Sequence, residues 1–195
     1  MLVGAALASN LVRLEERPTD AELVTAALRG ELTAKEQLFR RYVGMASATT
    51  YRLIGRDSEL EDIVQESFMQ ALATLDRLVE PQAFSAWLMR IVVGAAIATL
   101  RRRRLLTRLG LIRPEPIQLE SLVTRDVPPD IAADLRSIYR LIDALPAAER
   151  VILVLRRVEE LSLQEIADRT NWSLATVKRK LARAERLLDA SMVDH

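Results

Sequence analysis

Apolar residues recur at steps of three and four along most of the chain, and no segment shows the strict alternation of a half-buried strand. The clearest apolar stripe lies within residues 59–78. Its members are Ile63, Val64, Ser67, Phe68, Ala71, Leu72 and Leu75. A similar stripe within residues 81–104 consists of Phe84, Trp87, Leu88, Ile91 and Ala95. We therefore expect an all-α protein in which these stripes form the core.

The pattern predicts four helices in the first half of the chain and three or four shorter helices within residues 130–190. The four are Asp20–Gly30, Ala34–Gly55, Glu59–Leu78 and Pro81–Arg104. Capping boxes, in which a hydroxyl caps a backbone amide and a glutamate three residues later reaches back, mark three helix starts. These boxes are Thr19 with Glu22, Ser58 with Glu61, and Ser162 with Glu165.

Residues 105–129 break the helical pattern with Gly110, Pro114, Pro116, Pro128 and Pro129. We interpret this segment as a flexible linker, which can reach roughly 80 Å when fully extended. The sequence thus predicts two small helical domains, residues 18–104 and 130–195. An N-terminal extension, residues 1–17, precedes them, and the pattern does not indicate its role.

Composition argues against an enzyme. The 195 residues contain no cysteine, the single histidine is the last residue, His195, and the six glycines form no phosphate-binding loop. A disulfide scaffold, a thiolate or histidine metal site and a Ser-His-Asp triad are therefore not expected. We predict a binding protein that has no catalytic residues and uses neither a metal nor a cofactor.

We expect no membrane insertion. The longest apolar stretch, Phe84–Leu100, carries Arg90 and is shorter than the roughly 20 apolar residues that cross a bilayer. The apolar N-terminus lacks the basic start of a secretory signal. A cytoplasmic location is the simplest interpretation.

The charges balance overall, with 28 Lys+Arg against 27 Asp+Glu, but they are strongly segregated. No Asp or Glu occurs between Pro81 and Pro114, whereas acidic residues cluster just before this window. The arginines within it are Arg90, Arg101, Arg102, Arg103, Arg104, Arg108 and Arg113. Four adjacent arginines cover every side of a helix turn, so they cannot all pack. They form either a solvated helix end whose cations suit the helix dipole or a contact for a polyanion.

Residues 162–181 are typical of a helix-turn-helix. The small Ala167 allows close approach of the second helix, Asn171 tolerates a left-handed turn, and Ser173 can cap the next helix. Its inward positions are Leu174, Val177, Leu181 and Leu188. Its outward positions are Thr176, Arg179, Lys180 and Arg183. Such a face suits a DNA major groove, although an ordinary helical hairpin with a solvated basic face has the same pattern.

Two sets of residues, in this order and separation, resemble a known family. One is Asp62-Ile-Val-Gln-Glu-Ser-Phe68, similar to the family's D-x-x-Q-E-x-F, followed by Phe84-x-x-Trp87-Leu-x-Arg-Ile91 and the arginine run. The other is Leu145-Pro-x-x-Glu-Arg150, followed by Glu165-Ile-Ala167 and Thr176-Val-Lys-Arg-Lys-Leu181. Over roughly residues 20–190 the chain resembles an extracytoplasmic function (ECF, group IV) sigma factor of bacterial RNA polymerase, with sigma-70 regions 2 and 4.

The resemblance implies a promoter-specificity subunit that binds core RNA polymerase and double-stranded promoter DNA. Contacts are implied with the clamp of the largest polymerase subunits and the flap of the second largest, and with an anti-sigma factor that keeps the protein inactive. The implied polymerase-binding residues are Asp62, Gln65, Glu66 and Met69. Those implied near the −10 element are Arg90, Arg101, Arg102, Arg103 and Arg104. Those implied at the −35 element are Ser173, Thr176, Lys178, Arg179, Lys180 and Arg183.

The chain departs from the family on the predicted helix 81–104. Gly94 and Ala98 stand where members usually carry asparagine and aspartate, and Val93 stands where a basic residue is common. The stretch 91–98 is apolar nearly all round, so Val93 and Ile97 point away from the predicted core stripe. Two explanations are open. The −10 contacts come from the preceding loop and the arginines, or this apolar face is buried against a partner or a second domain.

Two other classes of function stay open at this point. A stand-alone helix-turn-helix regulator would bind paired half-sites as a dimer and would be indifferent to lysine at positions 62 and 66. A sigma-like decoy would bind polymerase without opening promoters, as the loss of polar residues at Gly94 and Ala98 allows. Run-off transcription with core polymerase separates a decoy from a sigma factor.

Overall fold

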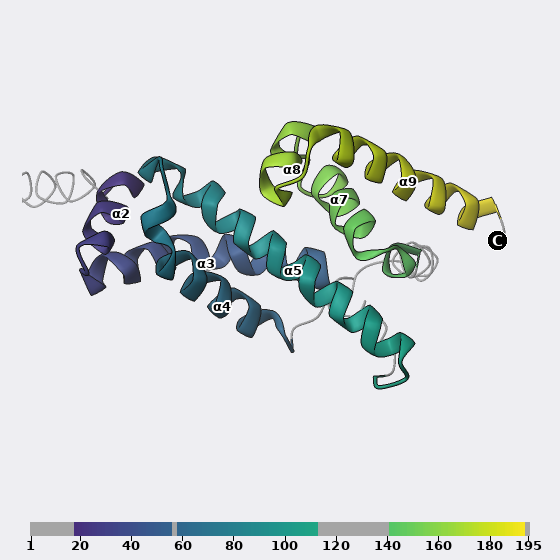
Figure 1. The fold of residues 1–195 in the computed structure, drawn as a ribbon, viewed down its shortest axis with the longest axis horizontal. Helices are drawn as coiled ribbons and strands as arrows, with labels where there is room; N and C mark the ends of the chain where they lie inside the picture. The colour runs from purple at the N-terminus through teal and green to yellow at the C-terminus, as the bar shows by residue number, and fades with distance from the viewer. Residues whose placement is uncertain (1–17, 56–57, 113–140, 194–195) are drawn as a thin grey trace, which may run out of the picture.

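The computed structural model describes residues 18–55, 58–112 and 141–193, and the regular structure in these ranges is helical (Figure 1). The elements in chain order are α2 (Asp20–Leu28), α3 (Leu32–Ile54), α4 (Leu60–Ala73), η1 (Leu75–Arg77), η2 (Pro81–Ala83), α5 (Phe84–Arg108), α7 (Ala147–Arg157), α8 (Leu163–Thr170) and α9 (Leu174–Val193). The predicted all-α class is confirmed. We call residues 18–112 the N-terminal lobe and residues 141–193 the C-terminal lobe.

Two of the three predicted capping boxes form. The Glu22 and Glu165 amides donate to the Thr19 and Ser162 hydroxyls at 3.3 and 3.2 Å, and each carboxylate accepts from the cap residue's backbone amide. The predicted box at Ser58 is wrong, because α4 begins after Glu59, which makes no side-chain cap. A capping sequence fixes a helix start only when the backbone of the hydroxyl residue takes the extended cap conformation.

The N-terminal lobe has its own apolar core, to which α2, α3, α4 and α5 all contribute. Phe84, Leu38 and Leu88 are fully buried in it. The predicted stripe on α4 is confirmed, since Ile63, Phe68 and their neighbours on that face are buried. Trp87 packs at the edge of this core, as predicted, with part of its surface exposed.

A polar contact joins α2 to α3 within the N-terminal lobe. The Tyr42 hydroxyl donates to the Asp20 carboxylate, and the Tyr42 ring lies 5.6 Å from that of Phe84. Burial, followed by the bond and charge of Asp20, raises the pKa of Tyr42 to about 12. The contact therefore needs the protonated phenol and is complete at neutral pH.

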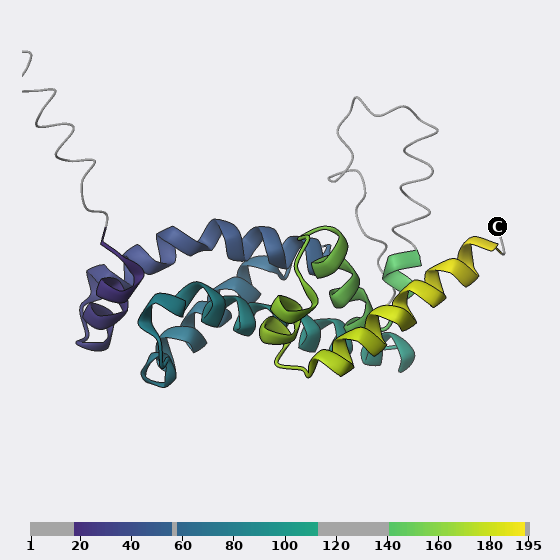
Figure 2. The same cartoon turned by 90° about the horizontal axis from the view of Figure 1, so that it is seen from above.

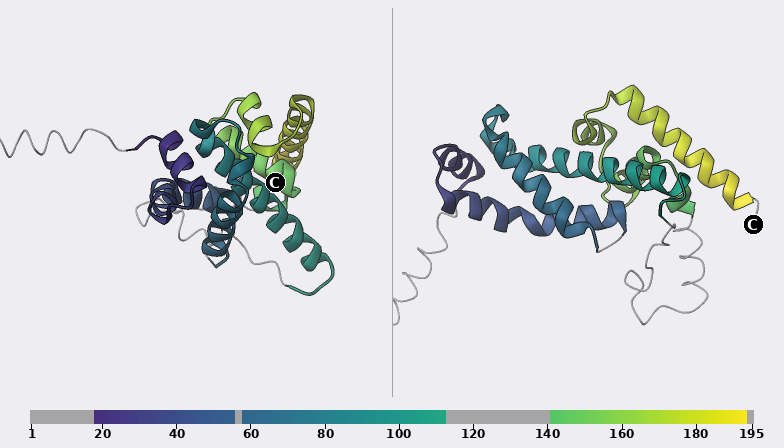
Figure 3. Two further views of the ribbon diagram at one scale, coloured as in Figure 1. Left: turned by 60° about the vertical axis from the view of Figure 1, so that its left-hand side comes forward. Right: turned by 60° about the horizontal axis from the view of Figure 1, so that its bottom comes forward.

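Helix α5 is buried over a wider arc than the predicted stripe. Met89, Val92, Val93 and Ile97 are buried, whereas Ile91 and Ala95 are only half-buried. The reason is that α5 lies between the other N-terminal helices on one side and the C-terminal lobe on the other (Figures 1 and 3). A helix packed on two sides has no single stripe.

The helix also runs through Arg108, so residues 105–108, assigned from the sequence to the linker, continue α5. Residues 109–112 form the turn and bend that follow α5, and residues 113–129 of the predicted linker lie outside the described residues, as do residues 1–17. Of the described helices, one meets the length and composition of a membrane span, the stretch Pro81–Arg108 with a mean hydropathy of 1.7 over its most apolar window. Of that window 39% is buried, and its buried apolar side chains lie in the two cores that α5 separates.

The two lobes share a second apolar core. Val93, Ala96 and Ile97 of α5 lie in one cluster with Val151 and Ile166 of α7 and α8. Of the two explanations for the apolar stretch on α5, burial against a second domain is the one that the structure bears out. Helix α9 packs on the outer side of α7 and α8, and its C-terminal end extends beyond these two helices (Figure 2).

Candidate nucleic-acid interface

The helix-turn-helix forms as the sequence predicts. Helix α8 ends at Thr170 and is capped by Asn171, whose φ of 56° and ψ of 36° are left-handed, and α9 begins at Leu174. The Ser173 hydroxyl caps α9 by accepting from the Thr176 amide at 3.2 Å, and it lies 2.9 Å from the Thr176 hydroxyl. Two of the candidate DNA contacts, Ser173 and Thr176, are thus engaged with each other at the start of the recognition helix.

A capping box fixes the start of α8. Hydrogen bonding from the Ser162 hydroxyl, followed by that from its backbone amide, lowers the pKa of Glu165. The carboxylate is therefore ionised at neutral pH, next to the positive end of the helix dipole. This arrangement holds α8 in place beneath α9.

The faces of α9 differ in part from the prediction. Val177 is fully buried and Leu181 and Leu188 are half-buried, but Leu174, predicted to point inward, is 37% exposed. Leu174 is the first residue of α9, where no neighbouring helix covers it. Lys178 and Arg179 are exposed on the opposite side, so they are available to a groove or a phosphate.

Two other cations of α9 are turned toward a buried carboxylate. Glu149, at the start of α7, lies 3.6 Å from both the Lys180 Nζ and the Arg183 Nη1, and its side chain is only 3% exposed. The Lys180 Nζ also lies 5.4 Å from the centre of the Trp172 ring. Sequence reasoning recorded Glu149 only as part of a family motif and missed its role in positioning the basic face.

The four adjacent arginines of α5, residues 101–104, do not all pack, as the sequence predicts. Arg103 donates twice to one Glu59 carboxylate oxygen, at 2.7 and 3.0 Å, and is mostly covered. Arg101, Arg102 and Arg104 are exposed. Among the ion pairs of the described residues, none involves Arg101, Arg102 or Arg104, whereas Arg103 is paired with Glu59.

Arg90 stands apart from the run, near the other end of α5. Its Nε donates to the backbone carbonyl of Asp168 in α8 at 3.1 Å, and its guanidinium lies 6.0 Å from the centre of the Trp87 ring. A candidate −10 residue is thus bonded to the C-terminal lobe in this arrangement.

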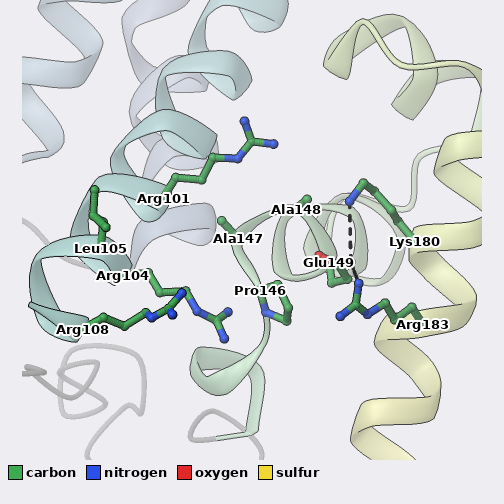
Figure 4. Close-up of a pocket in the computed structure, with 10 residues that line it drawn as sticks. All are labelled: Arg101, Arg104, Leu105, Arg108, Pro146, Ala147, Ala148, Glu149, Lys180 and Arg183. Carbon is green, nitrogen blue, oxygen red and sulfur yellow. Dashed lines mark ion pairs between the residues drawn. The ribbon is translucent and has the colours of Figure 1, made fainter.

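The two cationic surfaces meet in one cleft of about 460 Å³ (Figure 4). Arg101, Arg104 and Arg108 project into it from α5, and Lys180 and Arg183 from α9, with the start of α7 and Glu149 between them. Five cations thus face one carboxylate. Arg108 was not among the predicted contacts, because the sequence placed it in the linker.

The candidate polymerase-binding residues share a separate surface. Asp62, Gln65, Glu66 and Met69 are all exposed on α4, opposite the buried Ile63, Val64, Ser67 and Phe68. Among the ion pairs of the described residues, none involves Asp62 or Glu66. Met69 is 63% exposed, so an apolar side chain stands in water beside two free carboxylates. Such a mixed patch is typical of a protein contact.

The positions that depart from the family differ in their surroundings. Gly94 and Ala98 are exposed, and among the described residues no atom outside the neighbouring backbone of α5 lies within 4 Å of where a Cβ at Gly94 would stand. Val93 is fully buried by the C-terminal lobe. In the described part of the chain, no group of three or more acidic or imidazole side chains is arranged to hold a metal ion.

The comparisons with known proteins agree with this geometry. Residues 38–105 match the model of sigma-70 region 2, and residues 135–188 match the model of sigma-70 region 4. The chain is 31% identical over 151 residues to the ECF RNA polymerase sigma factor SigW of Bacillus subtilis, which covers 74% of this chain and 81% of that protein. It is 28% identical over 183 residues to the ECF RNA polymerase sigma-E factor of Escherichia coli, covering 90% and 95% of the two chains.

Two solved structures are similar in fold. The structure of CnrH in complex with the cytosolic domain of CnrY matches with a TM-score of 0.56 and 27% identity, covering 90% of this chain and 97% of that chain. The sigma factor RpoE in complex with the anti-sigma factor NepR from Bartonella quintana matches with the same TM-score of 0.56 at 21% identity, covering 80% and 95%. The second likeness concerns the fold alone.

Proposed function

The chain belongs to the ECF sigma factors of the sigma-70 family and directs transcription initiation, and from this premise we propose how its surfaces divide the work. It is not an enzyme in its own right; the chemistry belongs to the polymerase. In our proposal, α4 binds core polymerase, α9 reads the −35 element, and the arginines of α5 hold the −10 region.

The observation that carries the proposal is the separation of charge on the surface. Asp62 and Glu66 are exposed on α4 and form no ion pair within the described part of the chain, whereas a group of cations from α5 and α9 lines one cleft. DNA is negatively charged and is repelled by an acidic surface, so the acidic face of α4 suits a protein partner. The basic faces of α5 and α9 suit DNA phosphates. In this division Met69 adds apolar contact to the polymerase-binding face.

The promoter contacts are of two kinds. We assign base reading to the exposed Lys178 and Arg179 of α9, because the recognition helix of a helix-turn-helix enters the major groove. We assign phosphate contacts to Arg101, Arg102 and Arg104, which carry no sequence information but add salt-dependent affinity. Arg103 contributes less in this scheme, since Glu59 already neutralises it.

We propose that the chain acts in the cytoplasm, where core polymerase and chromosomal DNA are found, and that an anti-sigma factor controls it. Support for the second point comes from similar structures, one of CnrH with the cytosolic domain of CnrY and one of RpoE with the anti-sigma factor NepR. The domain limits we propose are residues 18–104 for region 2, whose last helix continues through Arg108, and 130–195 for region 4; both begin before the matched ranges 38–105 and 135–188.

The test is the double substitution Asp62→Lys and Glu66→Lys in the full chain. We expect binding to purified core polymerase to weaken more than tenfold, because each change converts an attraction across the interface into a repulsion. Glu36→Lys is the matched control, since Glu36 is an exposed carboxylate on α3 in a weak pair with Arg40. Unchanged polymerase binding by the double variant would show that another surface docks. Run-off transcription by the unaltered chain separates a sigma factor from a decoy.

A further inference from the structure

The cleft between α5, α7 and α9 has a strongly positive lining, and we call it the cationic cleft (Figure 4). Its volume of about 460 Å³ lies within the range of roughly 300–1,000 Å³ that is usual for small-molecule sites. Its charged lining residues are Arg101, Arg104, Arg108, Glu149, Lys180 and Arg183. Five positive charges therefore stand against one negative charge, which leaves the lining with a net charge of +4.

The cations lie on the faces of α5 and α9 that border this cleft. Arg101, Arg104 and Arg108 follow one another on α5 at steps of three and four residues. Lys180 and Arg183 stand one helical turn apart on α9. Side chains at such steps share one face of a helix, where like charges repel one another. An anion bound between the two rows of cations would therefore stabilise the arrangement.

The protein itself supplies little negative charge to the cationic cleft. No Asp or Glu occurs in residues 81–114, which include all of α5. Among the ion pairs of the described residues, none involves the three arginines by which α5 lines the cleft. The single carboxylate, Glu149, lies 3.6 Å from both Lys180 and Arg183, which is longer than an ordinary hydrogen bond. The N–H donors of these cations are thus open to a ligand.

The first turn of α7 brings backbone donors to the same cleft. Pro146, Ala147 and Ala148 line the cleft, and no side chain caps the start of this 11-residue helix. The first amides of a helix have no partner within the helix, and the helix dipole is positive at that end. Such a terminus favours a phosphate group, and here it lies between the cations of α5 and those of α9 (Figure 4).

A neighbouring hollow of about 320 Å³ shows that the excess of positive charge is local. This hollow shares two arginines of α5 with the cationic cleft. Each of its other arginines is paired with a carboxylate, Arg103 with Glu59 and Arg150 with Asp143. An anion should therefore bind in the cationic cleft in preference to the hollow beside it.

We propose that the cationic cleft binds a small oligophosphate, either inorganic triphosphate or the phosphate chain of a nucleoside triphosphate. A chain of three phosphates carries about four negative charges near neutral pH, which matches the net charge of the lining. Arginine holds phosphate oxygens through paired N–H groups, so the guanidinium groups of α5 and α9 bind the chain from its two sides. The start of α7 binds a phosphate group between them.

This inference goes beyond the proposed function, because it concerns a free small molecule and not promoter DNA. Its tests use neither polymerase nor DNA. A failure of these tests would leave the proposed function standing, and loss of polymerase binding in the Asp62→Lys and Glu66→Lys variant says nothing about the cleft.

The direct test is isothermal titration of the full chain with inorganic triphosphate. It is done without divalent cations, which compete for the phosphates, and at about 0.15 M salt, where distant surface charges are screened. We expect one triphosphate to bind per chain. Sulfate should bind at least about tenfold more weakly, because it has fewer charges and oxygens to share among the cations.

Two results of this titration contradict the proposal. If triphosphate does not bind to the unaltered chain, the cleft is not an oligophosphate site. If sulfate binds as tightly as triphosphate, the cleft is an adventitious anion site only.

Matched arginine variants locate the site. Arg104→Ala on α5 and Arg183→Ala on α9 should each weaken triphosphate binding about fivefold or more, because each removes hydrogen bonds to a charged group. The controls are Arg102→Ala and Arg179→Ala, since these two arginines are exposed on the same helices but do not line the cleft. Each control should change triphosphate binding by less than about twofold. Circular dichroism of the four variants checks that the fold is kept.

The pattern among the four variants can also overturn the proposal. Equal weakening by all of them would show only the general attraction of phosphate to a basic surface. Weakening by Arg183→Ala without weakening by Arg104→Ala would show that α9 alone attracts the anion and that the cleft does not bind it.

Adenosine triphosphate in the same titration identifies the source of the phosphate chain. Equal or weaker binding than that of inorganic triphosphate assigns the site to inorganic oligophosphate. Tighter binding assigns it to a nucleoside triphosphate, for which Leu105, a lining residue that is 57% exposed, offers an apolar contact to the base. Leu105→Ala should then weaken the binding of adenosine triphosphate and leave that of inorganic triphosphate unchanged.

Discussion

The two apolar cores of this protein differ in what surrounds them. The core of the N-terminal lobe is built around large side chains such as Phe84, Leu38 and Leu88, which come from helices joined by short connections. The buried side chains of the core between the lobes are aliphatic, such as Val93 and Ile97, and this core is bordered by Arg52, Arg90 and Arg150. Arg52 is 41% exposed, so water can replace its contact with Glu159, and we expect the second core to separate more readily than the first.

The largest effect should come from matched truncations on α5. Leu88→Ala removes an aliphatic side chain from the N-terminal core and should lower the free energy of unfolding by about 3–5 kcal/mol. Ile97→Ala removes an isomeric side chain from the core between the lobes and should cost about 2 kcal/mol or less, because the lobes can part instead of leaving a cavity. Denaturant unfolding followed by circular dichroism measures both.

Equal losses for Leu88→Ala and Ile97→Ala would mean that the two cores form one cooperative unit. In that case the lobes do not separate without unfolding. A second measurement is the distance between spin labels at Gln37→Cys and Asp189→Cys, two exposed positions on α3 and α9. In the Ile97→Ala variant we expect this distance to lengthen without polymerase.

A smaller effect is expected at the capping box of α8, which carries Ile166 and Ala167 into the core between the lobes. Ser162→Ala should destabilise the C-terminal lobe by about 1 kcal/mol. Thr19→Ala removes the corresponding cap from α2, which contributes only to the N-terminal core. Of the two variants, Ser162→Ala alone should lengthen the distance between the lobes.

The capping box of α8 also makes the stability of the C-terminal lobe depend on pH. Hydrogen bonding to Ser162 lowers the pKa of Glu165 below its ordinary value of 4.5. A lowered pKa in the folded state contributes stability above pH 4.5 that is lost as the pH falls through the folded value. Ser162→Ala should therefore make acid unfolding of the C-terminal lobe less steep, as measured by unfolding at a series of acidic pH values.

The smallest effect should be a loss of stability of the N-terminal lobe at alkaline pH. Burial and Asp20 raise the pKa of Tyr42 from 10.0 to about 12, so its contribution is fully present below pH 10 and is lost as the pH rises toward 12. Tyr42→Phe should abolish this decline, because it removes the hydroxyl that donates to Asp20. Ultraviolet absorbance of tyrosinate measures the titration. A tyrosinate signal unchanged by Tyr42→Phe near pH 12 would refute the assignment.

Local features were predictable because they depend on neighbours in the sequence. The apolar stripe of α4, the left-handed Asn171 and two of the three capping boxes follow from helical spacing and backbone preference. The exposed acidic face that contains Asp62 and Glu66 follows from the same stripe, since the residues opposite a buried face must meet solvent.

Other features escaped prediction for identifiable reasons. Leu174 is exposed because a helix terminus has no neighbour to cover it. Arg108 joins the cationic cleft because α5 continues past the predicted end of the helix. Glu149 is buried beside Lys180 and Arg183, a contact between residues more than thirty positions apart that no short-range pattern records.

The sequence by itself determined the helices, their polar faces and the segregation of charge, because each depends on periodicity over a few turns. Only the tertiary structure decided that Val93 and Ile97 meet α7 and α8, and that the cations of α5 and α9 face one another across a cleft. Hydrophobic burial has no direction of its own, so an apolar face in the sequence shows that a partner exists without showing which surface covers it.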